Sequence, residues 1–203
     1  MTYDILTALL LFAFVSSITP GPNNLMLMAS GANFGFARTI PHMLGVGIGF
    51  VVMVALVGVG LMQVFDSYPF AHTVLAVASV TYLLWLAWKV AHAGAPEEGE
   101  GTGGTPMTFL QAAAFQWVNP KAWTMALTAV TLYAPDRSLT AVLLVAAAFG
   151  AVNLPCVSSW TVLGQQMRRL LTSPARLTVF NWTMAGLLVL SLYPVLAPMV
   201  SAG

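Results

Sequence analysis

Two prolines and a glycine interrupt a long apolar stretch near the start of the chain. No residue from Ile5 to Ala37 is charged, and the centre of this stretch reads Thr19-Pro20-Gly21-Pro22-Asn23-Asn24. A stretch of this length can cross a bilayer as a helix, but each proline removes a backbone donor and clashes with the preceding turn. Carbonyls freed at membrane depth need partners, so such a break is tolerated only where protein or a water-filled cavity covers it.

A second break is predicted 100 positions later, at Asn119-Pro120-Lys121, again inside an apolar run. Helix breaks at corresponding positions in the two halves of a membrane chain point to a transporter binding site near the bilayer midplane. The two breaks are therefore the first candidates for a functional site.

The composition excludes a soluble domain. The 203 residues are 59% hydrophobic and 6% charged, whereas soluble domains carry about a quarter charged residues. A net charge of +1 gives no indication of a nucleic-acid partner. The single Cys156 excludes an intramolecular disulfide and a cysteine-based metal cage, and we expect no metal and no cofactor. The N-terminus lacks the basic region and cleavage site of a signal peptide, so we expect the first span to be retained.

Hydropathy predicts an all-α polytopic protein that crosses the lipid bilayer with six transmembrane helices. The expected spans are 4–30, 39–65, 70–92, 107–134, 138–165 and 177–200. A Gly/Glu-rich hydrophilic linker at 93–106 separates the first half, 1–92, from the second, 107–203. With three spans in each half, the second half enters the membrane from the opposite side. We therefore predict two inverted three-helix repeats with helices one and four broken; the alternative is that Ala/Gly-rich spans merely look alike.

The basic residues predict the orientation. One side of the membrane receives five of them, and the other receives one beside three aspartates. The first set is Arg38, Lys89, Arg168, Arg169 and Arg176, and the second is Arg137 with Asp4, Asp66 and Asp136. Short loops rich in Lys and Arg stay cytoplasmic. We expect a multi-pass protein of the cell inner membrane, with the linker in the cytoplasm and both termini outside it.

Lys121 is the strongest single candidate for function. It lies about 14 residues, roughly 20 Å along a helix, from either end of its predicted span, and an ionisable residue at that depth is a functional-site hypothesis by default. Asn119 is a good N-cap and Pro120 a good first helical residue, so a half-helix whose positive end favours an anion should begin here. The alternative is that the segment before Lys121 does not span, which leaves Lys121 at an interface.

We expect Lys121 and this helix start to bind the carboxylate of a substrate, because no Asp or Glu lies within the predicted span cores. Lys121 is also the candidate for proton coupling. Burial and the helix dipole favour its neutral amine, whereas a bound carboxylate favours the ammonium form. Substrate occupancy and proton occupancy would then be linked.

The first break offers the complementary chemistry. The prolines at 20 and 22 should leave the carbonyls of Ser16 and Ile18 without helical donors, and exposed carbonyls suit a cation such as an amino group. The amides of Asn23 and Asn24 add donors and acceptors. We assign Ser16, Thr19, Pro20, Gly21, Pro22, Asn23 and Asn24 to substrate binding; the alternative is a proline kink that only bends the helix.

Other polar or small residues in the spans are secondary candidates. Gln116, Asn153 and Asn181 are expected to line the cavity, with an interhelical hydrogen bond as the alternative, and Pro155 is a further point at which a helix could break. Gly45 and Gly49 form a GxxxG pattern that permits close helix approach, either within the subunit or in a homodimer. The histidines at 42 and 72 are expected at the membrane interface.

These residues together resemble the LysE/RhtB family of amino-acid exporters, and the likeness covers nearly the whole chain. It rests on Thr19 to Asn23, Gly45 to Gly49, Asn119 to Ala122, and Phe180-Asn181 with Met184 to Gly186. Thr19 to Asn24, Gly45 to Phe50 and Trp85 to Lys89 are similar to the branch that exports cysteine and O-acetylserine. The resemblance implies export driven by the proton gradient. Some members carry an acidic residue where Phe50 and Val51 stand here, which argues against a cationic substrate.

The sequence therefore predicts a secondary active exporter of a small neutral amino acid or derivative, of the cysteine, O-acetylserine, serine, threonine or homoserine type. A passive channel or facilitator for small polar solutes is the first alternative. An intramembrane enzyme is the second, and it would need a nucleophile–base pair, a metal cluster or a redox cysteine pair that the sequence does not supply.

Overall fold

The computed structural model describes residues 2–61, 67–68, 70–93, 105–136 and 138–193, and these residues form helices and connecting turns without a strand. In chain order the elements are α1 (Tyr3–Ile18), α2 (Pro22–Phe34), α3 (Phe36–Leu56), a π-helical turn (Val57–Leu61), α5 (Phe70–Ala91), α6 (Phe109–Phe115), a 3-10 turn (Gln116–Val118), α7 (Pro120–Tyr133), α8 (Leu139–Arg168) and α9 (Pro174–Leu190).

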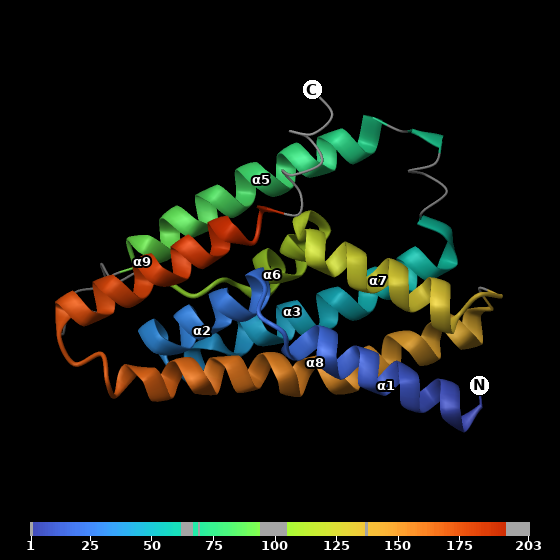
Figure 1. Ribbon diagram of the computed structural model, residues 1–203, viewed down its shortest axis with the longest axis horizontal. Helices are drawn as coiled ribbons and strands as arrows, with labels where there is room; N and C mark the ends of the chain where they lie inside the picture. Colours follow the sequence, from blue (N-terminus) through green and yellow to red (C-terminus); the bar gives the residue numbers. More distant parts are fainter. Residues whose placement is uncertain (1, 62–66, 69, 94–104, 137, 194–203) are drawn as a thin grey trace.

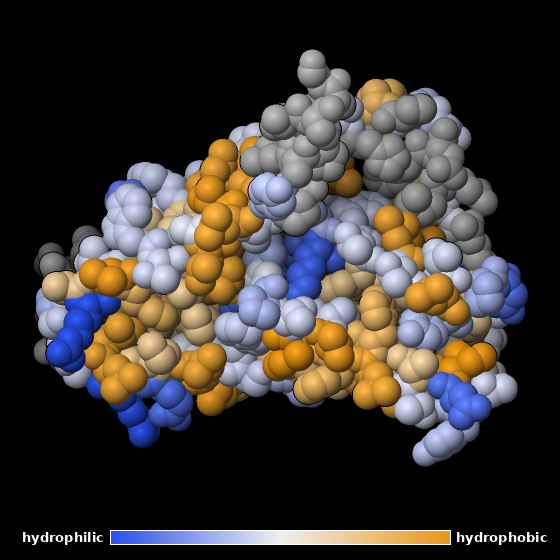
Figure 2. Space-filling model, viewed as in Figure 1, coloured by the Kyte–Doolittle hydropathy of each residue, from blue (hydrophilic) through white to orange (hydrophobic). Residues whose placement is uncertain are grey.

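Three helices in the described part of the chain are long and apolar enough to cross a bilayer: Phe36–Leu61, Thr73–Ala91 and Leu139–Arg168. Helices α1 and α2 make a fourth span if the pair, bent by 54° at its break, is counted as one. Large apolar side chains face outward along these elements, and Figure 2 shows orange and pale side chains over much of the visible face. The described part of the molecule is thus all-helical, with three or four helices suited to cross a membrane.

Each of the six predicted spans overlaps a described helix or helix pair, but the number of six spans and their arrangement in two inverted repeats stay predictions. Helix α9 has 17 described residues, and 194–200 of the predicted sixth span lie outside the described residues. Most of the predicted linker, 94–104, and Asp66 and Arg137 also lie outside them.

Helix α8 runs nearly the whole length of the molecule and packs against α1, α2 and α3, while α5 and α9 lie side by side along one edge (Figure 1). Helices α2 and α8 approach closely through two glycines. A Cβ on Gly31 would meet the backbone of Thr161, and a Cβ on Gly164 would meet the backbone of Met28. Small residues at such crossings let helix backbones approach in a membrane, where packing replaces the hydrophobic effect as the driving force.

Gly45 and Gly49 of α3 provide a second close crossing. A Cβ at Gly45 would meet the Phe109 carbonyl and the Ala112 side chain, and one at Gly49 would meet Ala113. These neighbours belong to α6 of the same chain, so the glycine face is used inside the subunit and is not free for a homodimer contact.

The largest buried apolar cluster joins α1, α3, α7 and α8. Phe149 lies at its centre, with its ring edge against Phe12 and Phe50 at centroid distances of 5.9 and 5.3 Å. This cluster packs α3, α7 and α8 around the middle of α1, ahead of the first break.

Two local expectations need correction, and the burial of His42 adds a third observation. Helix α8 continues through Pro155 from Leu139 to Arg168, because neighbouring turns and helices can absorb a proline in a membrane helix. His42 is only 2% exposed, so it is buried inside the protein, where it lines a cavity together with residues of α2 and α5. Helix α3 begins at Phe36, before the predicted start at residue 39, and it passes into a π-helical turn that contains Gly60 at φ 119°.

Candidate functional site

The first predicted break is present between α1 and α2. Helix α1 ends at Ile18, Thr19 and Gly21 have extended backbone, and α2 starts at Pro22. A proline suits this first helical position, because its missing N–H would have no partner there in any case. The chain turns by 54° at this point, so the apolar stretch contains two half-helices, as the sequence predicts.

The carbonyls at the end of α1 are held by an asparagine from the start of α2. Asn24 is buried, and its Nδ2 donates to the carbonyls of Ser17 and Thr19 at 2.8 Å each. One side chain thus joins the two half-helices across the break and fixes the angle between them.

The Ser16 and Ile18 carbonyls have no helical donor, because residues 20 and 22 are prolines, but the expectation that they are exposed is wrong. Trp160 Nε1 of α8 donates to the Ile18 carbonyl at 3.0 Å, and Thr19 Oγ1 donates to the Ser16 carbonyl at 3.0 Å. The physical reason is that a carbonyl at membrane depth must be satisfied, and here side chains satisfy both. A substrate amine therefore does not meet a set of bare carbonyls.

The second break also lies where the sequence predicts it. A 3-10 turn, Gln116–Val118, follows α6, and Asn119 then adopts φ −92° and ψ 109° before α7 starts at Pro120. The Asn119 side chain accepts the backbone N–H of Lys121 at 3.1 Å, which is the geometry of an N-cap.

The two breaks meet through Lys121. Its Nζ donates to the Thr19 carbonyl at 2.6 Å, to Thr19 Oγ1 at 2.9 Å and to the Pro20 carbonyl at 3.4 Å. The ammonium group thus sits at the C-terminal end of α1, where the helix dipole favours a positive charge. Sequence reasoning expected a negative partner for Lys121, but the partners in this structure are carbonyls and a hydroxyl.

A second contact ties the breaks together. Asn23 and Gln116 form a reciprocal amide pair, with Nδ2 to Oε1 at 2.9 Å and Nε2 to Oδ1 at 3.1 Å. Gln116 is fully buried and also donates to the Ala112 carbonyl at 2.9 Å. The pair joins residues 93 positions apart, so the two halves of the chain share one polar centre.

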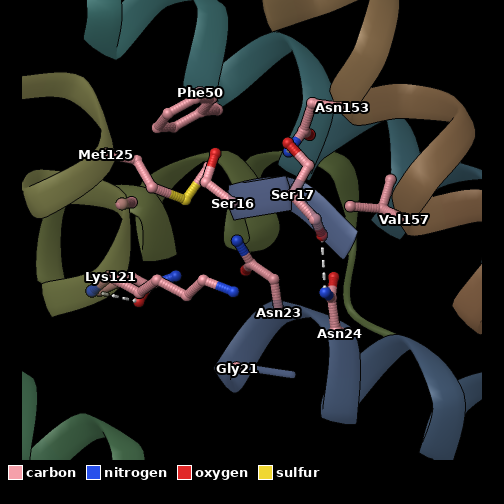
Figure 3. Close-up of a pocket in the computed structure, with 12 residues that line it drawn as sticks. Ser16, Ser17, Gly21, Asn23, Asn24, Phe50, Lys121, Met125, Asn153 and Val157 are labelled. Carbon is pink, nitrogen blue, oxygen red and sulfur yellow. Dashed lines mark hydrogen bonds between the residues drawn. The ribbon is translucent and has the colours of Figure 1, made fainter. Parts of the chain in front are cut away.

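A cavity of ≈ 20 Å³ lies at this centre, between α1, α2, α3, α7 and α8 (Figure 3). It is lined by Ser16, Ser17, Gly21, Asn23, Asn24, Phe50, Asn119, Lys121, Ala122, Met125, Asn153 and Val157. Among these lining residues Lys121 is the charged one, and the other polar groups are hydroxyls and amides. A cavity of about this size holds roughly one water molecule, so an amino acid fits only after the walls move.

Asn153 of α8 carries the unused hydrogen-bonding capacity in this cavity. Its Nδ2 donates to Ser17 Oγ at 3.1 Å, whereas its Oδ1 is buried without a hydrogen-bond partner. An unsatisfied buried acceptor costs about 1–3 kcal/mol, so a ligand donor that reaches it is stabilised. In Figure 3, Lys121 and Asn153 lie on opposite sides of the cavity, with Ser16 and Asn23 between them.

Comparison with known proteins identifies the family of this chain. A model of the family described as LysE type translocator matches residues 14–193. The chain belongs to this family. A cysteine/O-acetylserine efflux protein of Klebsiella pneumoniae is 28% identical over 195 residues, covering 93% of this chain and 95% of the relative. Proteins of the same description from Escherichia coli O1:K1 and strain K12 are 30% and 29% identical over 177 residues, 84% of this chain and 87% of each relative. No solved structure matches.

Not every predicted site residue of this LysE-type translocator lines the cavity. Asn181 exchanges hydrogen bonds with Asn33 at 2.8 and 3.2 Å and also donates to the Ala93 carbonyl. It therefore joins α9 to α2 and the end of α5, in line with the interhelical alternative. The other predicted residues that do not line the cavity lie next to residues that do. They are Thr19, Pro20, Pro22, Gln116 and Pro120.

Several residues of the candidate site were not assigned to it from the sequence, among them Ser17, Phe50 and Trp160. Ser17 adjoins the break, and its position there is the signal that could have found it. Trp160 and Phe50 come from other helices, and only the tertiary packing brings them to the end of α1. An indole or phenyl group in a membrane helix carries no local signal that separates a site from ordinary packing.

Proposed function

We propose that this LysE-type translocator exports a small neutral amino acid or derivative, of the cysteine and O-acetylserine type, by proton-coupled secondary active transport. The observation that carries the proposal is the cavity where the two breaks meet. It combines one cationic side chain with amide and hydroxyl groups, and none of its described lining residues is acidic. The names of the relatives, cysteine/O-acetylserine efflux proteins, support the same class of substrate.

The carboxylate of the substrate binds at the Lys121 side of the cavity. Lys121 Nζ and the first turn of α7 both favour an anion there, and Asn119 holds that turn in place. In the empty site Lys121 rests on Thr19 and Pro20. A carboxylate forms a stronger, charge-assisted hydrogen bond than a carbonyl does, so it can draw the ammonium group away from the end of α1.

The amino group binds at the opposite side. Asn153 Oδ1 is the buried acceptor without a partner, and the hydroxyls of Ser16 and Ser17 lie beside it. Since the lining offers no carboxylate, a second ammonium on the substrate would be buried without a counter-charge, at a cost of several kcal/mol. Lysine and arginine should therefore be poor substrates.

Movement of Lys121 enlarges the cavity. The Lys121 side chain lies against Gly21, where a Cβ would come within 2.6 Å of Lys121 Cδ. When Lys121 turns towards a carboxylate, the aliphatic part of its side chain moves away from Gly21 and the first break. Because the volume of ≈ 20 Å³ excludes an amino acid, substrate binding requires this rearrangement together with a shift of the half-helices.

The proton is carried by Lys121 in this proposal. In the empty site its ammonium group is held by the carbonyls of Thr19 and Pro20 at the end of α1. A proton-driven exporter has to move a proton inward as the substrate moves outward, so Lys121 would carry its proton inward while the site is empty of substrate.

Alternating access follows from the inverted repeat. Helices that would be counterparts in the two halves pack against each other, α3 with α8 and α5 with α9. This pairing supports a pseudo-twofold axis in the membrane plane, with the two breaks on either side of it. Rocking of one half against the other would expose the cavity first to one side and then to the other.

The proposed orientation puts both termini outside the cytoplasm of a cell inner membrane. Helix α8 would then point its Arg168 end into the cytoplasm. A membrane-impermeant thiol reagent on intact cells should label Thr2→Cys and not Thr172→Cys, both in a Cys156→Ser background. The reverse pattern would overturn the orientation.

Export itself is tested in inverted vesicles that hold a pH gradient. Each member of an amino-acid panel is added, and the expected result is that O-acetylserine or cysteine dissipates the gradient while lysine does not. Downhill flux that is unchanged when the gradient is collapsed would support a passive facilitator in place of the proposal. Lysine transport at the rate of the best neutral substrate would overturn the assigned substrate class.

A further inference from the structure

A second, larger cavity lies at the other end of α2. Its volume is ≈ 430 Å³, and it is lined by residues of α2, α3, α5 and the segment before α6. Ligand pockets for small molecules start at about 300 Å³, so this cavity accommodates a small amino acid without rearrangement. Asn24 at the helix break and Asn33 beside this cavity are nine residues apart on α2, which is roughly 13 Å along a helix.

His42 is the unexplained polar group in this cavity. The side chain is 2% exposed, it lines the cavity, and neither Nδ1 nor Nε2 has a hydrogen-bond partner. A neutral imidazole has one donor and one acceptor, and leaving both unmade in a buried position is costly. The neighbouring polar groups do not relieve it, since Ser30 bonds to Thr39 and Asn33 bonds to Asn181.

The charge of the lining indicates the ligand. Lys89 and His92 reach the cavity from α5, and none of the described lining residues is acidic. Lys89 Nζ lies 4.8 Å from the centre of the Trp85 ring, which is a contact and not an ion pair. A carboxylate is therefore the group that this lining lacks. A hydrogen-bonding group on the same molecule would satisfy His42.

We propose that this cavity is a second binding site for the amino acid that the translocator exports, with His42 hydrogen-bonding the ligand and Lys89 attracting its carboxylate. This inference rests on the proposed function for the identity of the ligand. The cavity lies at the end of the molecule that carries Arg38 and Arg168, which is the cytoplasmic end in the proposed orientation. The two sites lie at the two ends of α2.

The test is protection of a cysteine that lines the second cavity. Ala93 contributes to the lining, and Ala93→Cys in a Cys156→Ser background gives one reactive thiol there. O-acetylserine at ten times its dissociation constant should slow labelling by a small thiosulfonate reagent about tenfold, as mass action requires. Unchanged labelling would overturn the proposal, and so would equal protection by acetate, because acetate lacks the second polar group.

Two variants assign the protection to the right site. His42→Phe keeps a ring of similar size and removes both nitrogens, so it should fold with at least the thermal stability of the parent and lose the protection. Lys121→Ala disables the helix-break site and should keep the protection. Protection that survives in His42→Phe, or that disappears in Lys121→Ala, would place the ligand elsewhere and overturn the second site.

The same variants, together with an export assay, separate this inference from the proposed function. If O-acetylserine protects Ala93→Cys in a His42-dependent manner but is not exported by parent proteoliposomes, the second site stands and the proposed function fails. If export is intact and O-acetylserine gives no protection, the second site alone fails.

Discussion

The two helix breaks differ in how their backbone groups are satisfied. At the second break the polar groups are satisfied locally, since Asn119 caps the helix that starts one residue later. At the first break local donors from Thr19 and Asn24 are joined by donors from distant helices, Trp160 of α8 and Lys121 of α7. The second break is thus a self-contained helix start, whereas the first is an acceptor surface completed by other helices. Of the two, the first is the one whose contacts can change when a ligand arrives.

The largest effect is expected from removing the first break. Pro20→Ala with Pro22→Ala restores the backbone donors, so α1 can continue into α2 and the carbonyls of Thr19 and residue 20 enter the helical ladder. Lys121 then loses its acceptors. We expect a folded protein, judged by a monodisperse gel-filtration peak, that does not transport O-acetylserine in proteoliposomes. Normal transport by this double variant would show that the break is only a kink.

A smaller effect is expected when the contact between the breaks is crowded. Gly21 has φ −176°, a conformation open to any residue, but a methyl group there would lie 2.6 Å from Lys121 Cδ and 3.1 Å from its Nζ. Gly21→Ala should displace Lys121 from Thr19 and weaken transport about tenfold, which corresponds to about 1.4 kcal/mol.

The control for that substitution is Gly186→Ala in α9. Nothing lies within 4 Å of a Cβ at Gly186, so this change should leave transport unaltered. Equal transport by the two alanine variants would contradict the idea that Lys121 must stay close to the first break.

A substitution at the second break should mainly lower the stability of the folded protein. Asn119→Ala removes the N-cap of α7, and loss of such a cap costs about 1 kcal/mol. Asn119→Ser keeps a capping oxygen and should recover most of that loss in a thermal unfolding assay in detergent. If the serine variant is no more stable than the alanine variant, the cap is not what holds this break.

The smallest effect is expected from the amide pair that joins the breaks. Asn23→Ala, Gln116→Ala and the double variant form a thermodynamic cycle, and interhelical hydrogen bonds in membranes average about 0.6 kcal/mol. We expect a coupling free energy of that order, measured by unfolding. Strictly additive effects would show that the pair of hydrogen bonds at 2.9 and 3.1 Å does not couple the two halves.

The sequence predicts the local features of the fold and of the site well. Proline, glycine and asparagine have strong conformational preferences that act over a few residues, so both breaks and the start of α7 could be located without a structure. The apolar stretches likewise indicate the helices. The path of α8 through Pro155 could not be predicted, because it depends on what the surrounding helices tolerate.

The partners of the site could not be predicted because they arise from packing between distant segments. The donor to the Ile18 carbonyl is Trp160, 142 positions away, and the partner of Ser17 is Asn153, 136 positions away. Burial of His42 has the same origin, since residues of α2 and α5 line the same cavity. The position of Lys121 in its own helix was predictable, whereas its contact with Thr19 required knowing that the two breaks meet.

The central claim is that Lys121 rests on the first break when the site is empty and turns to the substrate carboxylate when it is occupied. Titration calorimetry of O-acetylserine into the purified protein tests this most directly. The parent, Lys121→Ala and Lys121→Arg are compared in a His42→Phe background, in which the second site is disabled and the helix-break site is intact. We expect binding by the parent, weakened binding by Lys121→Arg, which keeps the charge, and at least about a tenfold loss in Lys121→Ala, because hydrogen bonds to charged groups contribute about 1.5–3 kcal/mol. Binding by Lys121→Ala with the affinity of the parent would contradict the account and leave the turn at Asn119 and Pro120 as a purely structural feature.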